Sequence, residues 1–197
     1  MNKTKIILFS ILGFFLLIIF WVISSYNSLV SLDEGVNGAW SQVQNQYQRR
    51  YDLIPNLVET VKGYASHEKE VLIDITEARA KVGQLNVSEK ILNDPQTFQK
   101  FQQAQDGLSS ALSRLMVVVE KYPDLKANQN FLQLQSQLEG TENRIAVERK
   151  RFVEVTQSFN TSIRKFPASI IAAFTGFIKK EYFTAETKAQ EVPKVKF

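Results

Sequence analysis

Apolar residues fill nearly every position of the N-terminal stretch 6–23, whereas apolar and polar residues recur at helical spacing through the rest of the chain. As a helix, residues 6–26 would extend about 31 Å, the thickness of the hydrocarbon layer of a bilayer. Trp21 and Tyr26 stand where aromatic side chains line a membrane–water boundary. The stretch is longer than the apolar part of a cleaved signal peptide and lacks its small-residue cleavage site. We therefore expect a transmembrane anchor over residues 6–26.

The charged residues on either side of this stretch predict its orientation. Lys3 and Lys5 precede it, and the first charged residues after it are Asp33 and Glu34. Positive residues gather on the cytoplasmic side of membrane helices. We therefore expect a single-pass protein of the cell membrane, with the N-terminus in the cytoplasm and the helical bundle outside.

A helical pattern of apolar residues begins at Val36 and continues to Leu85. Alternating steps of four and three residues reach an apolar side chain at every position except Arg50 and Glu68. This spacing is typical of one helix that packs along a partner helix. Pro55 interrupts the pattern and predicts a kink, because its ring removes one backbone hydrogen bond. A full break at Pro55 is the alternative, although no turn sequence surrounds it.

Two further long helices are predicted in the second half of the chain. Asp94 followed by Pro95 is typical of a helix start, and the apolar pattern that follows ends at Pro123. Another helix is predicted over residues 128–166. The short apolar segment 168–178 either packs on the bundle as a fourth helix or contacts the membrane, since it is uncharged but too short to span a bilayer.

These patterns predict an all-α protein, in which an N-terminal transmembrane helix precedes an up-and-down antiparallel bundle of three long helices and one short helix. A stalk is expected because the first helix is longer than the helices that could cover it. The expected regions are a short cytoplasmic N-terminus (1–5), the transmembrane anchor (6–26), a helical stalk continuous with the bundle (27–54), the helical bundle (55–178) and an extended C-terminal tail (179–197).

The composition excludes several classes of chemistry. The chain has no Cys and one His, which excludes disulfides, thiolate metal sites and multi-histidine metal sites. It contains no glycine-rich phosphate-binding loop. Its net charge is only +4, without a basic stripe or an RNA-binding aromatic motif. We therefore expect no catalytic residues, no cofactor, no metal and no nucleic-acid partner.

One cluster of polar residues could bind a metal or another ligand. Steps of three and four residues place His67, Glu70 and Asp74 on one face of the first predicted helix. Carboxylates and histidines on bundle helices can hold metals, but such sites take a second His. A solvated helix face is the simpler interpretation of these residues.

Charged residues also stand inside the apolar patterns, at Arg50, Glu68 and Glu148. A buried charge is costly unless it is paired. We expect a structural ion pair between Glu68 or Glu148 and one of the arginines of the last long helix, namely Arg144, Arg149 or Arg151.

Three strings of sequence resemble the LemA family of bacterial proteins. They are AWSQVQNQYQRRYDLIPNLVETVKGYASHEKEVL (39–72), LSRLMVVVEKYPDLKANQNFLQLQSQLEGTENRIAVERKRF (112–152) and the ending PKVKF. Lys196 stands where the family's usual ending has an acidic residue. The resemblance implies a bacterial, membrane-anchored helical bundle without established activity, cofactor or agreed functional residues. It also implies two associations, because some relatives occur in magnetosome membranes and family genes often neighbour one for a membrane zinc metalloprotease.

Two functions follow from these observations. The favoured one is a membrane-anchored helical scaffold or adaptor at the cell envelope, acting through protein–protein interaction without catalysis. Its partners would be the lipid bilayer through residues 6–26, an unidentified membrane or envelope protein such as a membrane metalloprotease, and a second copy of the chain. The alternative is a ligand- or metal-binding envelope sensor, or an enzyme, using the face of His67, Glu70 and Asp74.

The candidate interaction surface consists of polar residues in the strings that carry the resemblance. For each of them, a role in helix capping, at the helix kink or in a salt bridge of the bundle is the alternative. These residues are Arg49, Arg50, Asn56, Asn143 and Arg144.

Overall fold

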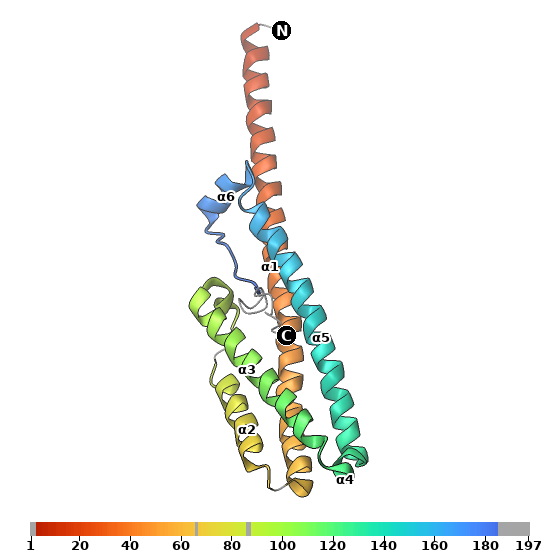
Figure 1. Ribbon diagram of the computed structural model, residues 1–197. Helices are drawn as coiled ribbons and strands as arrows, with labels where there is room; N and C mark the ends of the chain where they lie inside the picture. The colour runs from red at the N-terminus through yellow and green to blue at the C-terminus, as the bar shows by residue number, and fades with distance from the viewer. Residues whose placement is uncertain (1–2, 66, 86–87, 185–197) are drawn as a thin grey trace, which may run out of the picture.

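A computed structural model describes residues 3–65, 67–85 and 88–184, and these residues form helices without any strand (Figure 1). The prediction of an all-α fold is confirmed. Residues 1–2 of the expected N-terminus and 185–197 of the expected tail lie outside the described residues. The helices are α1 (Lys3–Tyr64), α2 (Lys69–Gly83), α3 (Pro95–Val119), α4 (Pro123–Lys126), α5 (Gln129–Ser162) and α6 (Ala168–Thr175), with a 3₁₀ turn η1 (Glu89–Asn93) before α3.

Helix α1 joins the apolar N-terminal stretch to the bundle in one continuous element (Figure 1). It has 62 residues, which corresponds to a length of about 93 Å. The apolar side chains of residues 7–23 are exposed, and within the described residues nothing packs over them. By length and composition, this part of α1 is apolar enough to cross a membrane.

The first helix does not break at Pro55, the alternative to a kink, and it ends well before Leu85, where the apolar pattern ends. Helix α1 continues through Pro55, whose ring is exposed, and ends at Tyr64. The chain then turns, and Glu68 N donates to Ala65 O at 3.1 Å. The prediction of one helix from Val36 to Leu85 was therefore wrong. After this turn α2 runs back along the bundle. In this position its apolar residues are buried against α3 and the end of α1.

The long helices form an up-and-down arrangement. Helix α1 runs away from the N-terminus, α2 returns, α3 runs away again and α5 returns to the level of α6 (Figure 1). Helix α5 packs along α1, and α2 packs against α3. The three long helices are thus α1, α3 and α5, and α2 is an additional helix of 15 residues that the prediction had merged with α1.

Side-chain caps fix the starts of the two later long helices. The carboxylate of Asp94 accepts a hydrogen bond from Gln96 N at 3.1 Å and precedes Pro95, as the sequence predicted for α3. Asn128 Oδ1 accepts from Phe131 N at 3.0 Å at the start of α5. The side-chain amide of Asn128 also donates to the hydroxyl of Tyr64 at 2.8 Å, which joins the start of α5 to the end of α1.

The buried core has two parts at different levels of α1. The part nearer the apolar stretch surrounds Trp40. The centre of its ring lies 5.2 Å from the ring centre of Phe152 and 5.4 Å from the ring centre of Phe101. The other part is mainly aliphatic and contains Leu57, Val61, Ile75, Leu108, Leu115 and their neighbours. We call these the aromatic core and the aliphatic core.

Residues 27–54 are part of the bundle and do not form a bare stalk. Leu29, Val36 and Trp40 are at most 2% exposed, because α5, α6 and the segment that follows α6 cover them. The helix is continuous from residue 27 to residue 54, as expected, but its division into stalk and bundle was wrong. The covering elements are distant in sequence, so the length of α1 alone could not reveal them.

The segment 177–184 runs without helical structure back along the bundle. Asn160 holds it by two hydrogen bonds with the backbone of Lys180, at 2.8 and 2.9 Å. The ammonium group of Lys180 lies 3.1 Å from the carboxylate of Asp33. Phe183 is 8% exposed and belongs to the aromatic core. The part of the expected extended tail that is described is therefore bound to the bundle.

Candidate functional site

Arg50 forms the centre of a polar cluster on the inside of the bundle. Its side chain is 1% exposed, and its Nη1 donates to Glu142 Oε1 at 2.7 Å and to Ser109 Oγ at 2.6 Å. Its Nη2 donates to the side-chain oxygen of Gln105 at 2.5 Å. These partners come from α3 and α5, so one guanidinium group joins three helices. Planar guanidinium suits such a buried, multiply bonded position better than lysine would.

The polar cluster decides between the two roles considered for Arg50 and removes it from the candidate interaction surface. Arg50 is a bundle salt-bridge residue and is not available at the surface. Its partner Glu142 precedes Asn143, so two of the strings that carry the family resemblance meet at this level of the bundle. The bundle therefore contains an ion pair with a buried arginine, but it joins Arg50 to Glu142, and neither residue belongs to the pair that we expected.

The acidic residues for which we expected an arginine partner have other surroundings. Glu68 accepts a hydrogen bond from the hydroxyl of Tyr122 at 3.0 Å, which raises the pKa of Tyr122. Glu148 Oε2 is buried and has no hydrogen-bond partner among the described residues. Arg149 Nη1 instead lies 3.9 Å from Asp106 Oδ1 of α3. The predicted pairing of Glu68 or Glu148 with an α5 arginine was therefore wrong.

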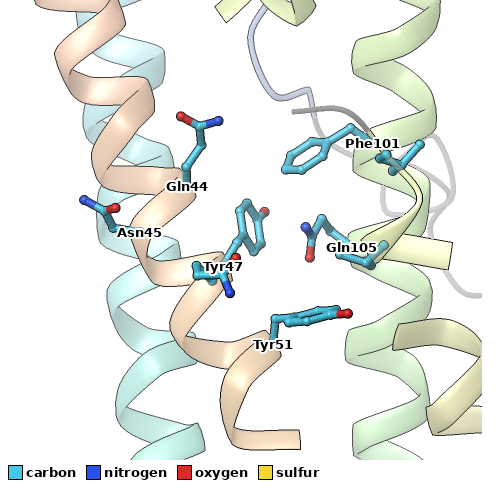
Figure 2. Close-up of a pocket in the computed structure, with 10 residues that line it drawn as sticks. Gln44, Asn45, Tyr47, Tyr51, Phe101 and Gln105 are labelled. Atoms are coloured by element: carbon cyan, nitrogen blue, oxygen red, sulfur yellow. The ribbon is translucent and has the colours of Figure 1, made fainter. Parts of the chain in front are cut away.

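A pocket of about 510 Å³ opens beside the polar cluster (Figure 2). Helix α1 contributes half of its lining residues, α2 contributes its C-terminal end, and α3 contributes the opposite side. Figure 2 shows the side chains of Tyr47 and Gln105 pointing toward each other across it. The lining residues are Gln44, Asn45, Tyr47, Gln48, Tyr51, Val82, Gly83, Leu85, Phe101 and Gln105.

Tyr51 is held in place at the edge of this pocket by α2. The guanidinium carbon of Arg79 lies 3.8 Å from the centre of the Tyr51 ring, and Arg79 Nε donates to the Tyr51 carbonyl at 3.3 Å. A Cβ atom at Gly83 would lie 2.9 Å from the Tyr51 hydroxyl oxygen. Glycine at position 83 therefore allows Tyr51 to lie where it does, and alanine there would displace its hydroxyl end.

The lining side chains offer hydrogen bonds without a formal charge. Glutamine and asparagine each present both donors and acceptors, and the tyrosine rings add flat apolar surface. Burial raises the pKa of Tyr47, so its hydroxyl stays protonated at neutral pH and can donate a hydrogen bond. Among the lining residues there is no carboxylate, histidine, lysine or serine to act as a base or nucleophile. The pocket is therefore suited to holding an uncharged polar group, such as a peptide amide.

The other candidate surface residues lie on α1 and α5. Arg49 and Asn56 are exposed on α1, on either side of the level of Tyr51. Asn143 and Arg144 are exposed on α5, and Asn143 lines a separate hollow of about 430 Å³ between α3 and α5. These four residues remain candidates for contact with a partner, but none of them lines the pocket next to Arg50.

The face of His67, Glu70 and Asp74 differs from its expected form. His67 lies in the turn before α2, so it does not share a helix with the two carboxylates. Asp74 Oδ2 accepts a hydrogen bond from Arg114 at 3.1 Å. Within the described residues, no group of three or more His, Asp or Glu side chains could hold a metal ion. The expectation that these three residues share one helical face was therefore wrong.

Sequence reasoning passed over the residues that line the pocket. The polar run QVQNQYQRRY places Gln44 and Gln48, and likewise Tyr47 and Tyr51, four residues apart, so each pair lies on one side of a helix. That repeat of amides and tyrosines was the available signal. The contributions of Gly83 and Gln105 depend on tertiary packing, because the folding back of α2 brings Gly83 to the site and the packing of α3 against α1 brings Gln105.

Comparison with known proteins finds a matching family and several related proteins. The sequence profile of the LemA family matches residues 39–197. The magnetosome protein MamQ of Magnetospirillum gryphiswaldense is 28% identical over 174 residues, which are 80% of this chain and 64% of MamQ. Protein LemA of Metamycoplasma hominis is 26% identical over 146 residues, which are 74% of this chain and 63% of that protein.

The match to the family profile includes every residue of the polar cluster and of the pocket. The alignments span less than two thirds of these two relatives' own lengths. The chain is a membrane-associated protein that belongs to the LemA family.

Proposed function

We propose that this protein is a membrane-anchored scaffold that binds a polypeptide segment of another membrane or envelope protein. The single observation that carries this proposal is the pocket beside Arg50, lined by amide and tyrosine side chains without a formal charge. Tyrosine and asparagine are frequent in protein recognition surfaces, because they combine flat contact area with adaptable hydrogen bonds. The pocket lies on α1, which also carries the apolar stretch, so the anchor and the binding site share one rigid element.

The proposal includes no catalytic step. The pocket offers hydrogen bonds and apolar contact, and binding of an extended peptide needs nothing more. A membrane metalloprotease and a second copy of this chain are the first partners to test. The polar residues exposed near the Arg50 level, Arg49, Asn143 and Arg144, would extend the contact beyond the pocket.

Crosslinking in intact membranes tests the pocket as the binding site. A photoreactive amino acid replaces Gln48, which lines the pocket, and in a control it replaces Lys150, whose side chain is 80% exposed on α5. We expect one discrete protein adduct from position 48 and none of the same mass from position 150. Identical adducts from both positions, or no protein adduct from position 48, would overturn the proposal.

A matched pair of glycine variants makes this test specific to the pocket. Gly83→Ala displaces the Tyr51 hydroxyl, whereas a Cβ atom at Gly107 of α3 meets nothing within 4 Å. If the displacement weakens binding by about 1.4 kcal/mol, the adduct from position 48 falls about tenfold in Gly83→Ala. It should not change in Gly107→Ala. An equal response of both variants would mean that the adduct does not depend on the pocket.

The proposed orientation places the N-terminus in the cytoplasm and the bundle outside it. Its support is the position of Lys3 and Lys5 before the apolar stretch and of Asp33 and Glu34 after it. A reporter that is active only outside the cytoplasm should be active when fused to the C-terminus and inactive when fused to the N-terminus. The reverse result would place the pocket in the cytoplasm and change the partners to be considered.

A further inference from the structure

We infer that α6 and the residues next to it form a second membrane contact, which lies in the interface of an anionic lipid bilayer beside the anchor. This inference rests on the membrane anchoring in the proposed function, and it adds a lipid-binding surface that is separate from the pocket.

One face of α6 packs on the bundle. Ile171 and Ala172 are 7% and 3% exposed and belong to the aromatic core. After α6, the ring centre of Phe177 lies 6.1 Å from the ring centre of Phe159 and 6.1 Å from that of Tyr26. These contacts fix α6 against α1 and α5, so its other face has a defined direction.

The opposite face presents apolar side chains that no described residue covers. Phe174 is 89% exposed, Phe166 is 81% exposed, and Ile170 and Ile178 are about half exposed. Ile170 and Phe174 lie one turn apart on the same side of α6, Phe166 lies two residues before this helix, and Ile178 lies three residues after it. A contiguous exposed apolar patch of this kind marks an interaction site on a protein surface.

The position of α6 identifies a lipid bilayer as the partner. Tyr26, which contacts Phe177, stands directly after the apolar stretch of α1, and Figure 1 shows α6 beside α1 where the uncovered part of that helix begins. When residues 6–26 lie in a bilayer, α6 is therefore at the level of the membrane boundary. Apolar side chains at that level enter the boundary between headgroups and acyl chains without spanning the bilayer.

The charges next to the patch fit an anionic membrane. Arg164 and Lys165 precede Phe166, and no acidic residue occurs between positions 164 and 180. Lys179 follows Ile178, and its Nζ lies 3.6 Å from Glu181 Oε1, so Arg164 and Lys165 are the main basic residues beside the patch. Arg164, Lys165 and Lys179 are exposed. Basic side chains near a membrane surface are attracted by anionic headgroups. The apolar patch and the basic residues together form the combination that interfacial helices use.

The experiment uses the full chain in vesicles of phosphatidylcholine and phosphatidylglycerol that contain a lipid with a nitroxide quencher. The natural chain has no Cys, so single cysteines can carry a fluorescent label at chosen positions. Ala173→Cys reports on α6, Phe20→Cys reports on the anchor, and Val147→Cys reports on an exposed site of α5 far from the patch. We expect lipid quenching at positions 20 and 173 and none at position 147.

Two double variants separate the patch from the anchor. Replacing Phe166 and Phe174 together by Ser should remove the quenching at position 173 and leave that at position 20 unchanged. Replacing Val117 and Val147, which are 68% and 63% exposed elsewhere on the bundle, by Ser should change neither. Vesicles of phosphatidylcholine alone should reduce the quenching at position 173 only.

Three different outcomes would contradict the inference, and each points to a different cause. Quenching at position 20 with none at position 173 would overturn the contact of α6 with lipid and leave the anchor intact. Absence of quenching at both positions would overturn the anchor itself. Protection of position 173 that rises with protein concentration and does not depend on lipid would show that a second copy of the chain covers the patch, and would also overturn the inference.

Discussion

Replacing Glu142 by Ala is expected to lower the free energy of unfolding by about 3 kcal/mol, because it leaves the guanidinium of Arg50 buried without its counter-charge. Arg50 is 1% exposed, so without the carboxylate its buried charge would keep only its hydrogen bonds to Ser109 and Gln105. Urea unfolding of the full chain in detergent micelles, followed by far-UV circular dichroism, measures the change. Glu139→Ala is the matched control, since this exposed residue one turn earlier bonds only to Gln135 in α5, and we expect a change within about 0.5 kcal/mol.

The reverse substitution, Arg50→Met, is expected to be less destabilising, at about 1–2 kcal/mol. The side chain of Glu142 is 40% exposed and can be hydrated when Arg50 is absent. Methionine is flexible and can fill part of the space that the arginine leaves. The double variant of Arg50→Met and Glu142→Ala should be more stable than Glu142→Ala alone, because no unpaired charge stays buried. If the two single effects simply add, the ion pair is not the source of the stability.

The second large effect is expected at Trp40, where substitution by Ala should cost about 3–5 kcal/mol. Its ring is fully buried and lies 5.2–6.1 Å from the rings of four phenylalanines in α3, in α5 and in the segment after α6. The same unfolding measurement applies. Trp21→Ala is the matched control, because Trp21 lies in the exposed apolar stretch and contributes no core contact. We expect it to leave the unfolding of the bundle nearly unchanged.

Loss of Trp40 should also loosen the segment that follows α6. Phe183, whose ring lies 6.1 Å from Trp40, is the apolar anchor of this segment, and Glu181 N donates to Leu92 O at 2.8 Å. Hydrogen exchange of the Glu181 amide should therefore become faster by more than the loss of global stability explains. An exchange rate that changes only as much as the global stability would contradict this local dependence on Trp40.

The polar cluster also explains how the helices find their register. The aliphatic core on one side and the aromatic core on the other consist of contacts that depend weakly on direction. The bonds of Arg50 to Gln105, Ser109 and Glu142 depend strongly on direction and distance. These bonds therefore favour the alignment of α1, α3 and α5 in which all of them form.

The candidate site could be predicted only in part. The need for a partner at Arg50 followed from its place in the apolar pattern, but the identity of that partner, Glu142, depended on the packing of α1 along α5. The pocket required the end of α2 and the middle of α3 to meet α1. Those contacts join residues more than thirty positions apart, and no local pattern specifies them.

The sequence by itself determined the apolar stretch at residues 6–23, the helical periodicity after it, the cap at Asp94 and the all-α class. Each of these depends on neighbours within a few residues, where spacing and local hydrogen bonding decide the outcome. The turn after Tyr64 was decided by the tertiary structure, because local propensity through residues 65–68 still allowed a helix. The packing of α5, α6 and residues 177–184 buried the apolar side chains of residues 27–54, where the pattern had suggested only a stalk. The end of α2 and the middle of α3 formed a pocket against the same part of α1.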